Sequence, residues 1–263
     1  MSEVALFIHS TGTGPFMWTS LMAACPQGVQ PIAPTNRGYA MNDLLPRGTP
    51  FSVEDEVRHL KAQIPADATG VHLMAHSYGG FAALTLAMDA SVPVRSLWLY
   101  EPVLFASLHA KAAVAGALPA DATQEVASFF DDPDFIANEE RGGSDAWLER
   151  FVDYWNQPGM WAAMPDKAKA MARAVGWKMF LEVRSVATEP QPFEHYRLQV
   201  PLTLVRGERT TASAREMVNH LAQANPHAQV QTLQGLGHMA VLSAPQQVLP
   251  TLTDHWGRAI LRA

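Results

Sequence analysis

The chain has 263 residues, 48% hydrophobic and only 17% charged, a composition that supports a large folded core and excludes a disordered chain. Its net charge is −6 without a cluster of lysine and arginine, which argues against nucleic acid as a partner. The single cysteine, Cys25, excludes an internal disulfide. The N-terminal residues lack a signal-peptide pattern, and no apolar run reaches the roughly 18 residues of a membrane span. We therefore expect a cytoplasmic protein with no membrane partner, whose oligomeric state the sequence leaves open.

The first hundred residues alternate short apolar runs with helical patterns. We expect strands over residues 4–8, 31–34, 71–75 and 94–100, and helices over 16–24, 53–64 and 78–89. Ser52 is the expected N-cap of the second helix, with Asp55 at its third position and acidic residues in its first turn. Strands joined through helices predict an α/β fold with a mostly parallel sheet.

The composition then changes. Residues 104–195 are rich in alanine, methionine and tryptophan and contain no strand candidate. Helices are expected there over residues 108–118, 122–130, 146–155 and 168–183. The alternation resumes with strands over residues 200–207 and 228–234 and helices over 213–224 and 245–261. The helical block is therefore an insertion folded over the sheet.

Ala75-His76-Ser77-Tyr78-Gly79 follows an apolar strand and opens a helix. A small-x-Ser-x-Gly pattern in that context is typical of a nucleophile elbow, a strained turn that needs small flanking residues and holds the serine above the sheet edge. On its own the turn also fits a serine that merely caps a helix. As a nucleophile, Ser77 would need a base to take its proton.

His238 lies on a loop between the last strand and the last helix, where such a base is expected. Any one of ten histidines is more often structural, and the loop position is what favours His238. The segment HSTGTGP after the first strand would form an oxyanion loop, with the backbone N–H groups of Thr11 and Tyr78 as donors. Alone, this segment also fits a plain loop of glycine and proline.

Together the serine turn, the late histidine, the oxyanion loop and the helical insertion resemble the α/β-hydrolase superfamily. The resemblance spans the chain and implies an α/β-hydrolase fold with a core of residues 1–103 and 196–263 and a helical cap of residues 104–195. It implies a small-molecule substrate, no cofactor and no metal. The chain would start near the third strand of the family's sheet, with the first two strands absent or reduced.

The acid of the triad departs from the commonest pattern. An Asp often follows the family's seventh strand, but here Thr210 occupies that place in Gly207-Glu208-Arg209-Thr210 and cannot carry a charge. Glu101, just past the preceding strand, matches members that take the acid from that strand end. We expect Glu101 to orient His238, with Glu208 as the alternative.

The oxyanion loop has Ser10 where the family usually has glycine, and Ser10 either contacts substrate or bonds within the loop. Hydroxynitrile lyases resemble this feature but carry a lysine beside the histidine, which is missing here. Arg37, Trp155 and Trp161 are further candidate substrate contacts. Most cap tryptophans and methionines are expected to pack in the core, and a few to form an apolar pocket. His9 and His76 are expected to be structural.

The leading hypothesis is a serine hydrolase that cleaves a carboxylic ester of a small, largely apolar substrate through an acyl-enzyme. C–C bond or lactone hydrolysis would use the same residues. A serine argues against epoxide hydrolases and haloalkane dehalogenases, whose nucleophile is an Asp. A non-catalytic ligand-binding protein on this fold is the alternative of another class, and a missing Ser77–His238 hydrogen bond would favour it.

Overall fold

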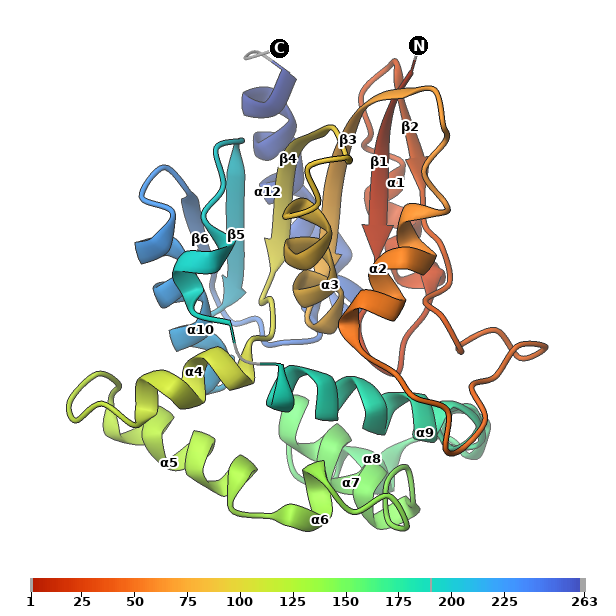
Figure 1. The fold of residues 1–263 in the computed structure, drawn as a ribbon, viewed down its shortest axis with the longest axis vertical. Coiled ribbons are helices and arrows are strands. Elements are labelled where there is room, and N and C mark those ends of the chain that lie inside the picture. Colours follow the sequence, from red (N-terminus) through yellow and green to blue (C-terminus); the bar gives the residue numbers. More distant parts are fainter. Residues whose placement is uncertain (1, 190, 261–263) are drawn as a thin grey trace.

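The computed structural model describes residues 2–189 and 191–260. Its centre is one sheet in which every pair of neighbouring strands is parallel, in the order β2-β1-β3-β4-β5-β6 (Figure 1). The strands are β1 (Ser2–Ile8), β2 (Val29–Ile32), β3 (Ala68–His76), β4 (Val94–Tyr100), β5 (Leu202–Gly207) and β6 (Gln229–Leu233). The α/β fold with a parallel sheet is confirmed, although the second strand ends at Ile32 and not at residue 34.

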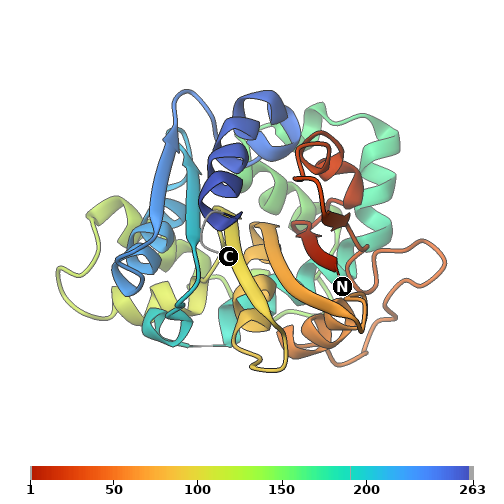
Figure 2. The same cartoon turned by 90° about the horizontal axis from the view of Figure 1, so that it is seen from above.

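Helices cover both faces of the sheet because successive strand side chains point to opposite sides. Leu6 and Ile8 of β1 pack in one apolar layer, and Ala5 and Phe7 pack in the other. The flanking helices are α1 (Thr19–Met22), α2 (Val53–Lys61), α3 (Tyr78–Ala87), α10 (Ala212–Ala224) and α12 (Pro245–Ile260). Residues of α2, α3 and α10 belong to the first layer and residues of α1 and α12 to the second, and Figure 2 shows the two sets on opposite sides.

Several of these helices begin as the sequence predicts. Ser52 and Asp55 form a capping box at the start of α2, which ends at Lys61 rather than at residue 64. The helix expected over residues 16–24 is instead a 3-10 turn, η1 (Pro15–Trp18), followed by α1. Leu261, the expected end of the last helix, lies outside the described residues.

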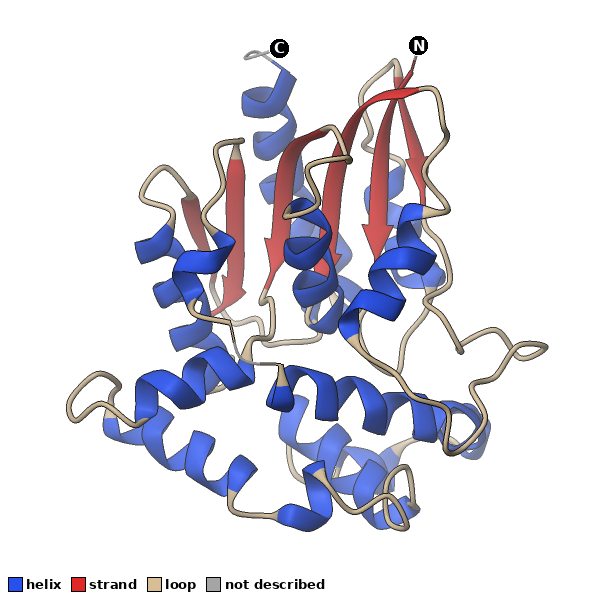
Figure 3. Ribbon diagram, in the orientation of Figure 1, coloured by secondary structure: helices blue, strands red, loops and turns tan. Residues whose placement is uncertain are grey.

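The segment between β4 and β5 is helical and lies across the carboxyl ends of the strands (Figure 1, Figure 3). It contains α4 (Phe105–Ala112), α5 (Ala120–Phe130), α6 (Pro133–Ile136), α7 (Asp145–Trp155), α8 (Met160–Ala163), α9 (Asp166–Thr188) and the 3-10 turn η2 (Phe193–Tyr196). Its first helix ends at Ala112 and does not reach residue 118, and Gly116, within the remaining stretch, has a positive φ of 75°. The short helices α6 and α8 were not expected. The division into core and cap domains stays a prediction.

The carboxyl ends of β1, β3, β4 and β5 face this helical segment, which lies below them in Figure 1. In open parallel sheets, ligands bind outside these strand ends. The loop that carries His238, between β6 and α11 (Ala240–Ser243), reaches the same region. Within residues 2–189 and 191–260, no helix combines the length and apolar character that a membrane crossing needs.

Candidate active site

Ser77 occupies a strained turn between β3 and α3. Its φ of 56° is positive, which is rare for residues other than glycine, and such strain costs on the order of 1–3 kcal/mol. A Cβ atom at Gly79 would lie 2.4 Å from the carbonyl oxygen of Ile8, and one at Gly80 would lie 2.6 Å from Cβ of Pro102. The small residues after Ser77 therefore let α3 approach β1 and the segment after β4, as the motif predicts.

Ser77, His238 and Glu101 form a continuous hydrogen-bonded chain. His238 Nε2 lies 3.0 Å from Ser77 Oγ, and His238 Nδ1 lies 2.6 Å from Glu101 Oε2. All three residues are buried, with exposed fractions of 6% or less. The structure thus brings together three residues from three separate strand ends, in the arrangement that a base needs to activate a serine hydroxyl.

The carboxylate of Glu101 is held by further donors. The backbone N–H of Gly207 donates to Oε1 at 2.7 Å, and the hydroxyl of Thr210 donates to Oε2 at 2.6 Å. Thr210, which occupies the position where the acid more often lies, therefore contacts the Glu101 carboxylate. Glu208 instead accepts a hydrogen bond from the exposed N–H of Gly235 and does not contact His238.

The His238 ring is fixed from other sides as well. Trp155 of α7 stacks on it with ring centroids 3.9 Å apart and planes inclined by 26°. His76 Nε2 lies 2.9 Å from the backbone carbonyl oxygen of His238. Burial, and then the neighbouring His238, lower the pKa of His76 well below its usual value, so a neutral His76 donates to this carbonyl. The hydroxyl of Tyr100 donates to the carbonyl of Gly237 at 2.8 Å.

Thr11 and Tyr78 line the same small cavity as Ser77. Tyr78 is the first residue of α3, where a backbone N–H has no partner within the helix. The loop that carries Thr11 is braced by His9, whose Nδ1 donates to Ser10 O and whose Nε2 accepts from Asn36 N, both at 2.9 Å. Burial lowers the pKa of His9 to about 4, which keeps the ring neutral for these two bonds.

A buried polar network ties the loop after β1 to helix α9. The hydroxyl of Tyr39 accepts from the N–H of Gly12 at 2.9 Å and donates to Glu182 Oε2 of α9 at 2.7 Å. Lys178 Nζ donates to Glu182 at 2.6 Å and to Glu56 of α2 at 2.7 Å. Burial raises the pKa of Glu182. Sequence reasoning missed this network, and the available signal was a lysine and a glutamate four residues apart in the otherwise apolar run GWKMFLEV.

Two cavities of unequal volume meet at Ser77. The smaller measures about 20 Å³ and lies between the turn, α4, α5, α7 and α9. The larger measures about 260 Å³ and also contacts His238 and residues 10–13 of the loop after β1. Met160, Met164 and Met179 line the larger cavity, whereas Met171 is exposed, so the expected apolar pocket includes part of the cap's methionines.

The expected substrate contacts divide into two groups. Trp155 lines both cavities, and Ser10 lines the larger one while its hydroxyl lies 3.1 Å from Thr13 Oγ1. Arg37 and Trp161 line neither cavity. The guanidinium of Arg37 lies 3.6 Å from Asp55, and the Trp161 ring packs beneath two cationic side chains of α9.

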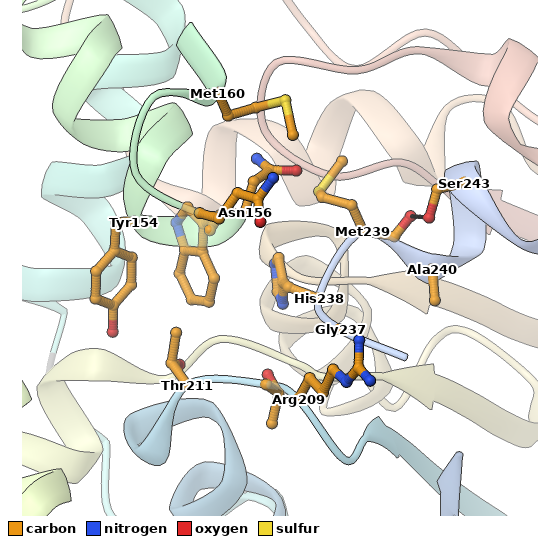
Figure 4. A pocket seen from close by; sticks show the side chains of 13 residues that line it. Tyr154, Asn156, Met160, Arg209, Thr211, Gly237, His238, Met239, Ala240 and Ser243 are labelled. Atoms are coloured by element: carbon orange, nitrogen blue, oxygen red, sulfur yellow. Dashed lines mark hydrogen bonds between the residues drawn. The ribbon is translucent and has the colours of Figure 1, made fainter. Parts of the chain in front are cut away.

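A third, more open pocket of about 190 Å³ reaches His238 from the side of α7 and the loop before α10. Figure 4 shows Asn156 and Met160 on one wall of this pocket and Arg209 on another, with His238 between them. Within residues 2–189 and 191–260, no three or more side chains of His, Cys, Asp or Glu gather in a way that could hold a metal ion.

The family model described as the alpha/beta hydrolase family matches residues 5–251. A carboxylesterase structure from Nitrososphaera gargenis shares 14% identity and a TM-score of 0.67, covering 100% of this chain and 92% of that chain. An enol-lactonase structure from Burkholderia xenovorans LB400 has 15% identity and a TM-score of 0.63, and the match covers 98% of this chain and 92% of that chain. The structure of carboxylesterase CesB from Bacillus subtilis has 17% identity and a TM-score of 0.64, and the match covers 97% of this chain and 84% of that chain.

No curated protein gives a significant match. At identities this low, the likeness to solved structures shows the fold alone, and it agrees with the parallel sheet and flanking helices described above. The family model covers nearly the whole chain, including the serine turn and the late histidine. The chain therefore belongs to the alpha/beta hydrolase family and has its fold.

Proposed function

We propose that this chain is a serine hydrolase that cleaves a carboxylic ester of a small, largely apolar molecule through an acyl-enzyme. The observation that carries the proposal is the hydrogen-bonded chain from Ser77 to His238 to Glu101, at 3.0 and 2.6 Å. The buried carboxylate accepts from His238, Gly207 and Thr210, a donor set that suits an ionised acid.

In the proposed mechanism, His238 Nε2 takes the proton of Ser77 as Oγ attacks the ester carbonyl carbon. The resulting oxyanion accepts hydrogen bonds from the backbone N–H groups of Thr11 and Tyr78, each worth about 3 kcal/mol in comparable sites. Glu101 holds the Nδ1–H of His238 and stabilises the imidazolium. The imidazolium then gives its proton to the leaving alkoxide oxygen, and water activated by His238 releases the acid.

Catalysis is favoured over a purely ligand-binding role by the intact bond between His238 and Ser77. The positive φ of Ser77 is a strained backbone conformation, and such strain clusters at functional sites, which also supports catalysis. The preference for an apolar substrate rests on the larger cavity, whose walls include Met164, Met179 and Leu242.

The proposal is tested by turnover of p-nitrophenyl acetate by the wild type, Ser77→Ala and Ser128→Ala. Ser128 is an exposed serine of α5 and serves as the matched control. We expect activity of the wild type and Ser128→Ala to be equal, and Ser77→Ala to lose at least 10³-fold in kcat, in line with removal of other triad nucleophiles. A folded Ser77→Ala protein that keeps the wild-type rate would contradict the proposal.

A further inference from the structure

The two cavities that meet at Ser77 differ in size and in their relation to His238. The smaller, about 20 Å³, holds roughly one water molecule, and His238 does not line it. The larger, about 260 Å³, is lined by His238, Met239 and Leu242 as well as by the oxyanion loop. A substrate bonded to Ser77 would therefore have one substituent in the smaller cavity and the other in the larger cavity.

The chemistry of ester cleavage decides which part of the substrate takes which side. As the tetrahedral intermediate collapses, the bond between the carbonyl carbon and the leaving oxygen breaks, and that oxygen takes the proton from His238 Nε2. The leaving alcohol must therefore lie on the side of His238, and of the two cavities that meet at Ser77 only the larger is lined by His238. The acyl substituent then points into the smaller cavity, between Ser77, Thr11 and Tyr78 on one side and α9 on the other.

The walls of the smaller cavity are rigidly packed. Phe105 and Phe129 stack in parallel with ring centroids 4.1 Å apart. Val183 and Val186 of α9 close the opposite wall, and both are about 5% exposed. Their helix is anchored through Glu182, which also lines the cavity and is bonded to Lys178 and Tyr39. An acyl chain longer than about two carbons would have to displace close-packed side chains, which is costly.

We infer that the enzyme takes esters of a short acyl group, of about acetyl size, with a larger apolar alcohol. The inference rests on the proposed function and deepens it by naming the substrate class. Val183 and Val186 are the specificity-determining residues on the acyl side. One methylene in a confined apolar pocket changes kcat/KM by about 10- to 200-fold, so the preference is measurable.

The test compares two ester series: ethyl esters from acetate to hexanoate, and acetate esters from ethyl to hexyl and benzyl. We expect kcat/KM to fall at least tenfold from acetate to hexanoate and to rise at least tenfold from ethyl to hexyl acetate. In Val186→Ala, the hexanoate-to-acetate ratio should rise about tenfold because two methyl groups leave the wall. Val183→Ala should also raise the hexanoate-to-acetate ratio, and it replaces Val186→Ala in the test if that variant does not fold.

Val152→Ala is the matched control, because Val152 lines only the larger of these two cavities. It should leave the acyl ratio unchanged and alter the preference among alcohols. A wild type that prefers hexanoate to acetate, or a Val152→Ala variant that shifts the acyl ratio as Val186→Ala does, would overturn the inference while the proposed function stands. A folded wild type that cleaves no ester of either series would overturn the proposed function and, with it, this inference.

Discussion

Glu101 sits on the turn after β4 at a φ of 43°, a second positive value outside glycine. Its side chain is fully buried, and three donors converge on its two oxygens. A carboxylate accepts from all three, whereas an amide would present an NH₂ group to at least one of them. The charge of Glu101 is therefore suited to hold His238 in one tautomer.

Glu101→Gln is expected to lower kcat by on the order of 10²–10⁴, since the amide neither fixes the tautomer of His238 nor stabilises the imidazolium. Glu208→Gln is the matched control and should stay within about twofold of the wild type, because Glu208 contacts an exposed backbone N–H. Steady-state rates of ester hydrolysis measure both. Equal losses, or a loss only in Glu208→Gln, would refute the assignment of the acid.

The serine turn was predictable from sequence because its physics is local. The strand, the small residues and the helix start all lie within residues 71–89. The contacts of Glu101 were only partly predictable, because it lies at a strand end but its contact with Thr210 depends on two loops 109 positions apart. Arg37 was expected near the site from its place after a strand, yet its side chain turns toward Asp55 of α2.

Tyr39 connects helix α9 to the loop after β1. Its hydroxyl bridges the N–H of Gly12 and the carboxylate of Glu182. The two partners of Tyr39 lie 27 and 143 positions away in the sequence, so no periodicity or short motif could have revealed the link. Only the fold brings these residues together.

Tyr39→Phe is expected to lower kcat about 10- to 100-fold with little change in KM, because a loop that is less firmly held presents the Thr11 N–H less well to the oxyanion. Tyr196→Phe is the control, since Tyr196 is also a buried tyrosine and lines neither cavity at Ser77. Both variants should be assayed as folded protein. A loss carried by KM alone, or an equal loss in Tyr196→Phe, would contradict this role of Tyr39.

At the scale of the whole molecule, buried histidines link stability to pH. Burial lowers the pKa of His9 to about 4 and that of His255 to about 3, while an unfolded chain binds a proton near pH 6.5. The unfolded state therefore binds more protons between these values, and the neutral rings stabilise the fold fully only above about pH 6.5. Stability is lost as the pH falls from there toward the folded pKa values.

We expect the free energy of unfolding to fall between pH 7.5 and pH 5 by on the order of 1–2 kcal/mol for each such histidine. His255 lies far from Ser77, bonded to Thr203 and Ser96. In His255→Gln, the fall in the free energy of unfolding between the two pH values should be smaller by about 1–2 kcal/mol, the contribution of one histidine. Ester turnover at pH 7.5 should be unchanged in the folded variant. Chemical denaturation at both pH values measures the change in the free energy of unfolding. If this change is as large in His255→Gln as in the wild type, burial of the neutral His255 ring is not its cause.

Covalent labelling by a fluorophosphonate probe tests whether Ser77 is an activated nucleophile. Such a probe reacts with a serine whose proton is taken by a base and whose oxyanion is stabilised. We expect labelling of the wild type at Ser77, located by peptide mass spectrometry, and no labelling of Ser77→Ala. A well-folded wild type that stays unlabelled, or that is labelled at another residue, would show that Ser77 is not the activated nucleophile.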